Sequence, residues 1–70
     1  MTIGSRIKEL LKARGMTQRQ LAKDANVSVS YLAGIESDKY KPSIKTLARI
    51  ANALNVAIEE LTTGGNNNEQ

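Results

Sequence analysis

The hydroxyl and amide side chains of this 70-residue chain stand where they can form hydrogen bonds at helix ends, and the sequence contains no His and no Cys. That absence removes disulfides, Cys/His metal sites and the common nucleophile–base pairs. The adjacent acids Glu59 and Glu60 fall at the start of a short terminal helix, where carboxylates favour the helix dipole, and no Gly-rich phosphate loop occurs. We therefore expect a protein that is not an enzyme and uses no cofactor.

Two of the hydroxyls, on Thr17 and Ser28, stand where helices are expected to begin. The run Thr17-Gln18-Arg19-Gln20 has the capping-box pattern, in which the Thr17 hydroxyl accepts from the Gln20 backbone N–H and the Gln20 amide reaches back. Ser28 is placed to cap the following helix by the same kind of bond. The chemistry that these residues offer is hydrogen bonding at two successive helix starts.

The elements that must position these hydroxyls read as short helices. Apolar residues recur at helical spacing over residues 3–14, and Thr2 can cap that segment. Capping and periodicity also predict helices over residues 18–25 and 29–36. Asn26 lies between them, where a left-handed residue is expected, and Asn tolerates that conformation.

Beyond these three helices, residues 37–42 form a polar loop, because a proline disfavours helix at the residue before it. Ser43 is expected to cap a fourth helix that ends at Asn55. Its predicted apolar stripe is Ile44, Leu47, Ala48, Ala51 and Leu54. A short fifth helix is expected over 57–61, and residues 62–70 read as a flexible tail without apolar side chains.

The sequence therefore predicts an all-α domain of five helices over residues 3–61. With no Phe and no Trp, its core must be built from small aliphatic side chains. No apolar run approaches the roughly 18 residues that span a membrane, and the N-terminus does not resemble a signal peptide. We expect a cytoplasmic location.

Charge is distributed unevenly along the chain, although the net charge is only +3. All ten basic residues and four of the seven acids fall in residues 1–49, which gives that part a balance of +6. The last three acids fall in residues 50–70, which have no basic residue and a balance of −3. Such asymmetry suits a basic face for a polyanion, although uneven charge on an ordinary helical protein fits it equally well.

The segment from Thr17 to Glu36, a capped helix, a tight turn and a second capped helix, has the helix-turn-helix pattern. Here the chain resembles the Cro/repressor-type family, also called Xre-like or lambda-repressor-like. The resemblance is carried by Arg6-Ile7-Lys8, Thr17-Gln18, Leu21-Ala22, Val27-Ser28, Tyr31-Leu32, Ile35-Glu36, Pro42-Ser43, Leu47, Ala53-Leu54-Asn55-Val56 and Glu60-Leu61. It implies a compact five-helix, lambda-repressor-like fold that binds double-stranded operator DNA as a homodimer, with residues 29–36 in the major groove.

The resemblance also implies roles for individual residues. The positions matching the family's base-contacting residues are Val29, Ser30, Ala33 and Gly34. Those expected to hold phosphates are Thr17, Gln18, Ser28, Tyr31, Lys39, Tyr40, Lys41 and Ser43. Apolar residues left over after one core is filled suggest a dimer contact through Ile50, Leu54, Val56, Ile58 and Leu61.

The chain departs from the family pattern at several positions. Asn26 and Asn55 replace the usual glycines, and Ala57 replaces a capping hydroxyl, which should weaken the fifth helix by roughly 1 kcal/mol. Leu11 stands where many members have an arginine that pairs with the acid at Glu36, so the sequence names no partner for Glu36. The base-contacting positions also lack Gln and Arg, which favours recognition through methyl contacts, DNA shape and water.

Two alternatives to a stand-alone regulator remain open. The domain could be a protein-interaction module such as an antitoxin or co-regulator, although such surfaces usually expose aromatic or Met anchors. It could also be the N-terminal DNA-binding part of a longer repressor, because a flexible tail would serve as a linker.

Overall fold

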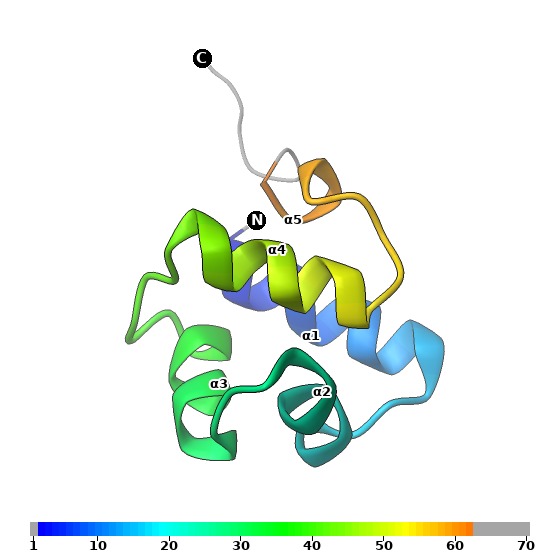
Figure 1. Cartoon of the computed structure of the whole chain (residues 1–70), viewed down its shortest axis with the longest axis horizontal. Helices are drawn as coiled ribbons and strands as arrows, with labels where there is room; N and C mark the ends of the chain where they lie inside the picture. The colour runs from blue at the N-terminus through cyan, green and yellow to red at the C-terminus, as the bar shows by residue number, and fades with distance from the viewer. Residues whose placement is uncertain (1, 63–70) are drawn as a thin grey trace.

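Five helices make up the part of the chain that the structure, a computed structural model, describes, which is residues 2–62. They are α1 (Ile3–Arg14), α2 (Gln18–Ala25), α3 (Val29–Glu36), α4 (Ile44–Ala53) and α5 (Glu59–Thr62) (Figure 1). Helix α2 packs against α3 and α4, while α1 packs against α3 and α5. No helix within the described residues is long and apolar enough to cross a membrane. Most of the expected tail lies outside the described residues.

Each of the first four helices begins at a hydroxyl side chain that accepts from a backbone N–H three residues further on. The pairs are Thr2 with Ser5 (3.1 Å), Thr17 with Gln20 (3.0 Å), Ser28 with Tyr31 (3.0 Å) and Ser43 with Thr46 (3.2 Å). Such a cap is worth about 1 kcal/mol, and it fixes the residue at which the helix starts. The predicted bounds of α1, α2 and α3 are confirmed, while the Gln20 side chain makes no return bond to Thr17 among the described residues.

The core is a single aliphatic cluster to which all five helices contribute. Its buried members are Ile7, Leu11, Leu21, Ala22, Ala25, Leu32, Ile35, Leu47, Ile50, Ala51, Leu54 and Leu61. Small alanines on α2 let its backbone approach α4 and α3 closely, which offsets the absence of large aromatic side chains.

The inward face of α4 differs from the predicted one. Ile44 is 71% exposed and Ala48 is also exposed, whereas Ile50, which the predicted stripe omitted, is fully buried. The inward stripe therefore runs through Leu47, Ile50, Ala51 and Leu54, and the first turn of α4 projects beyond the core. The outer face of α4 is left with apolar side chains at its surface.

Helix α5 begins two residues later than predicted, at Glu59. The missing hydroxyl at Ala57 explains the shift, because the chain there closes only short turns, from Glu60 N–H to the Ala57 carbonyl and from Leu61 N–H to the Ile58 carbonyl. Arg6 holds α5 against α1 instead, since its Nε donates to the Glu60 carbonyl at 2.8 Å and its guanidinium pairs with the Glu60 carboxylate at 3.3 Å. Arg6 thus ties α5 to α1.

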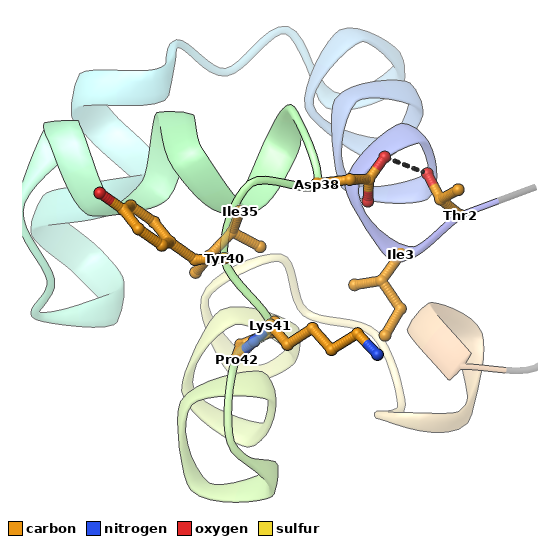
Figure 2. A pocket seen from close by; sticks show the side chains of 7 residues that line it. All are labelled: Thr2, Ile3, Ile35, Asp38, Tyr40, Lys41 and Pro42. Carbon is orange, nitrogen blue, oxygen red and sulfur yellow. Dashed lines mark hydrogen bonds between the residues drawn. The ribbon is translucent and has the colours of Figure 1, made fainter.

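Asp38, directly after α3, joins the start of α1 to the loop before α4. Its backbone is left-handed, with φ of 64°, and its carboxylate accepts from the Thr2 hydroxyl at 2.8 Å (Figure 2) and from the Gly4 N–H at 3.2 Å. Beside this tie lies a cleft of about 450 Å³ that the loop residues Tyr40, Lys41 and Pro42 help to line. Asp38 therefore fixes the position from which the loop leaves α3.

Replacing Asp38 with Gly should lower the free energy of unfolding by about 1 kcal/mol, because the Thr2 hydroxyl and the Gly4 N–H lose their acceptor while glycine adopts the left-handed backbone without strain. Urea denaturation followed by far-UV circular dichroism measures this as a lower midpoint with an unchanged slope. Asp38→Asn is the matched control, since it keeps an acceptor oxygen and tolerates positive φ; equal destabilisation by both substitutions would contradict the capping role.

Candidate nucleic-acid interface

Helices α2 and α3 form one rigid corner joined by the turn at residues 26–28. Asn26 is left-handed with φ of 60°, as predicted, and its N–H bonds to the carbonyls of Ala22 and Lys23. The Val27 N–H continues the turn with a 2.9 Å bond to the Ala22 carbonyl. The corner sets where α3 begins and which of its side chains remain at the surface.

The start of α3 presents side chains that the fold leaves free. Ser28 caps the helix, Val29 is 41% exposed, and Ser30 is also exposed. Leu32, one turn along, is fully buried, so α3 is anchored on one side and open on the other. An exposed valine beside a serine offers a methyl surface and a hydroxyl for contacts with base edges.

The start of α2 lies next to the end of α3 through one side-chain bond. The Gln18 Nε2 donates to the Glu36 Oε1 at 3.1 Å, and Glu36 is only 4% exposed. Gln18 itself is half-buried, and the exposed Thr17 beside it caps the helix. This bond supplies the partner of Glu36 that the sequence did not name.

The loop after α3 folds back onto the helix at Gly34. The Gly34 carbonyl accepts from the N–H of Lys39 at 2.8 Å, from the N–H of Tyr40 at 3.1 Å and from the Ser37 hydroxyl at 3.2 Å. The Tyr40 ring covers Gly34, where a Cβ would overlap its edge, and its centroid lies 5.7 Å from that of Tyr31. The loop is therefore held in a fixed position against α3.

A shallow groove of about 540 Å³ joins the outer face of α3 to this loop. Its lining is Ser30, Ala33, Gly34, Ser37, Lys39 and Tyr40. The Lys39 ammonium lies 5.6 Å from the centre of the Tyr40 ring, which keeps a positive charge at the edge of the groove. Residues predicted to contact bases and residues predicted to contact phosphates thus share one surface.

Comparison with known proteins agrees with this geometry. The model of the helix-turn-helix family matches residues 7–61 of the chain. The chain belongs to the helix-turn-helix family. It is 51% identical over 61 residues to the immunity repressor protein of Bacillus phage phi105, an alignment that covers 87% of this chain and 42% of that protein.

Solved structures place the chain among lambda-repressor-like helix-turn-helix domains. The N-terminal DNA binding domain of SinR from Bacillus subtilis is 38% identical, with a TM-score of 0.80 over 86% of this chain and 88% of that one. The P22 c2 repressor, solved in complex with a synthetic operator, is 25% identical, with a TM-score of 0.84 over 93% and 98%. The chain spans 42–66% of the length of the first three curated relatives it matches.

Within this helix-turn-helix frame, five of the predicted site residues line one groove, namely Ser30, Ala33, Gly34, Lys39 and Tyr40. Lys41 lines the separate cleft beside Asp38, where its side chain extends toward Ile3 (Figure 2). Val29, Ser30 and Ala33 sit on the outer side of α3, with Ala33 half-buried in the groove. Gly34 is a correction: it is buried beneath Tyr40, so its missing side chain gives room to that ring and not to a nucleic acid. Tyr31, which is expected to hold a phosphate, is half-buried and packs against the core.

The predicted dimer contact needs a second correction. Ile50, Leu54 and Leu61 are at most 1% exposed and belong to the chain's own core, so they have no surface left for a partner. From the sequence, these residues looked like apolar side chains that the core did not need, because the sequence did not show how far the core extends between α4 and α5. Val56 and Ile58 remain half-buried and accessible.

Two sets of hydrogen bonds were not predicted from the sequence: the bond from Gln18 to Glu36, and the bonds that join Asp38 to the start of α1. Both join residues that are far apart in the chain, and neither has a periodic signal. A usable hint existed for Glu36, since an acid between apolar positions in the last turn of a helix requires a donor.

Replacing Gly34 with Ala should lower the free energy of unfolding by about 1–3 kcal/mol, because the new methyl group overlaps the Tyr40 ring. Thermal unfolding of Gly34→Ala, Tyr40→Ala and the double variant measures the coupling. The Gly34 substitution should cost much less in the Tyr40→Ala background. Equal costs in both backgrounds would show that the ring is not what Gly34 accommodates.

Proposed function

We propose that this domain is a sequence-specific, DNA-binding transcriptional regulator of the repressor type, with the start of α3 in the major groove. The observation that carries the proposal is the single surface on which the free side chains of α3 adjoin the basic loop. In this arrangement Val29 and Ser30 face base edges while α2 crosses the phosphate backbone. Similarity to an immunity repressor and to a repressor solved in complex with an operator supports the same function.

Phosphate contacts come from groups on either side of α3. Thr17, Gln18 and Ser28 lie at two helix starts, where free backbone N–H groups and the helix dipole favour an anion. On the other side, Lys39 and Lys41 are exposed on the loop that Gly34 and Asp38 hold in place. These contacts position the protein on DNA and carry no sequence information of their own.

A titration of duplex DNA tests this proposal. Binding through about six or more phosphates should lose orders of magnitude in affinity between about 50 and 200 mM salt. Lys41→Ala should weaken binding to every sequence by a similar factor and reduce the slope of log K against log salt by about one. Lys8→Ala, on the outside of α1, is the control and should leave the slope unchanged.

Fluorescence anisotropy of labelled duplexes provides the measurement. If the domain shows no salt-sensitive DNA binding even at low salt, the proposal that it is a DNA-binding regulator is wrong. A protein-interaction module would then be the better description.

We also propose that the domain binds a pseudo-palindromic operator as a homodimer, with half-sites about one helical turn apart, roughly 10–10.5 bp. The contact would use the outer face of α4, where a groove of about 520 Å³ is lined by Ala48, Val56 and Ile58 among others. Exposed Ile44 adds apolar surface at one end of the same helix. Apolar side chains that one protomer leaves uncovered are suited to burial against a second copy.

Ala48→Lys should weaken self-association at least tenfold, because it adds a third positive charge beside Lys45 and Arg49, which line the same groove, without altering the core. Sedimentation equilibrium at several concentrations, with and without DNA, measures the effect. Ala13→Lys, the same change at an exposed position of α1, should leave association intact. A wild-type chain that stays monomeric at high concentration, alone and on DNA, would contradict the dimer proposal.

A further inference from the structure

Glu36 is the one charged residue buried in the core among residues 2–62, and it is only half satisfied. It is 4% exposed, and its Oε1 accepts from the Gln18 Nε2 at 3.1 Å. Its Oε2 is buried without a hydrogen-bond partner among the described residues. A buried carboxylate with a single neutral donor is an expensive arrangement.

Stability does not account for this carboxylate. Glu36 is the last residue of α3, where the negative end of the helix dipole disfavours an acid. Arg6 is committed to Glu9 and Glu60, and buried Leu11 has no charge to offer. An apolar side chain of similar size would avoid the cost of removing the charge from water.

The Glu36 carboxylate determines the orientation of the Gln18 side-chain amide. An ionised carboxylate can only accept hydrogen bonds, whereas a glutamine amide has one accepting end and one donating end. Glu36 therefore holds the Gln18 amide with its NH₂ group inward and prevents the reverse orientation. One of the two N–H bonds is used by Glu36, and the other stays available to a second acceptor.

We propose that Glu36 is a positioning residue for DNA binding, which fixes the Gln18 amide so that its second N–H donates to a phosphate oxygen. Gln18 is the first residue of α2 and lies beside the Thr17 cap, where the free N–H groups of the helix start also favour an anion. The inference rests on the proposed function, since it assigns one contact of the same surface. Because the contact is to phosphate, it acts on every DNA sequence alike.

This role makes a prediction opposite to that of simple electrostatics. Removing a negative charge beside a polyanion should tighten binding, and removing a buried, unpaired charge should not destabilise the fold. If Glu36 positions Gln18, Glu36→Met should instead weaken DNA binding while stability stays the same or rises. A merely structural role would move stability and affinity downward together.

The experiment uses the whole chain and a random-sequence duplex of roughly 20 bp, two helical turns, at low salt. Fluorescence anisotropy should show Glu36→Met and Gln18→Ala each weakening binding by about 10- to 100-fold, the value of one hydrogen bond to a charged group. The double variant should bind no more weakly than Gln18→Ala alone, because both changes remove the same contact. Glu36→Gln should fall between wild type and Glu36→Met, since a glutamine permits both orientations of Gln18.

Urea denaturation of each variant and NMR of the Gln18 side-chain amide complete the test. The Gln18 amide proton bonded to Glu36 should be shifted from the value of a free glutamine and slow to exchange with solvent in the wild-type protein, and both differences should disappear in Glu36→Met. Glu36→Met binding as tightly as wild type or tighter overturns the inference, and so do additive effects in the double variant. If Glu36→Met does not fold, Glu36→Gln is used in its place, and its DNA affinity is compared with that of wild type and of the double variant with Gln18→Ala. A wild-type chain that binds no duplex refutes the proposed function itself, which separates the two failures.

Discussion

The carboxyl end of α3 is held by side chains and backbone from three other parts of the chain, and the arrangement of the surface depends on that hold. Gly4 of α1 lies so close that a Cβ would overlap the Ile35 and Glu36 carbonyls. Gln18 of α2 donates to Glu36, and the Gly34 carbonyl takes two backbone N–H groups from the following loop. Because this end of α3 is fixed, the side chains at its start can be exposed without contacts of their own to hold them in place.

This hold explains how a small chain with no Phe and no Trp presents a rigid surface. Aliphatic packing supplies most of the driving force, but it does not specify direction. Direction comes from hydrogen bonds at the ends of elements: four hydroxyl caps, the Asp38 carboxylate and the Arg6 guanidinium. The same bonds fix the orientation of the start of α3 and the position of the loop over the helix.

Much of the fold was predictable from the sequence, because its signals are local. Thr17 and Ser28 start their helices where the capping pattern placed them, and Asn26 takes the left-handed conformation expected of it. The inward face of α4 was only partly predictable, because two apolar stripes have helical spacing, one through Ile44, Leu47, Ala48 and Ala51 and the other through Leu47, Ile50, Ala51 and Leu54. Packing in the fold buries the second stripe and leaves Ile44 exposed. In the site, the exposed start of α3 followed from its cap, whereas the burial of Gly34 under Tyr40 depends on how a loop folds back.

Selection of bound sites from random duplex DNA would show whether the start of α3 contacts base edges. The wild-type chain and a variant with Val29 and Ser30 exchanged would be selected in parallel. Wild type should enrich two half-sites about one helical turn apart, and the variant should keep this spacing while preferring different bases within each half-site. Enrichment of the same bases by both proteins, or no enrichment by wild type, would contradict this prediction.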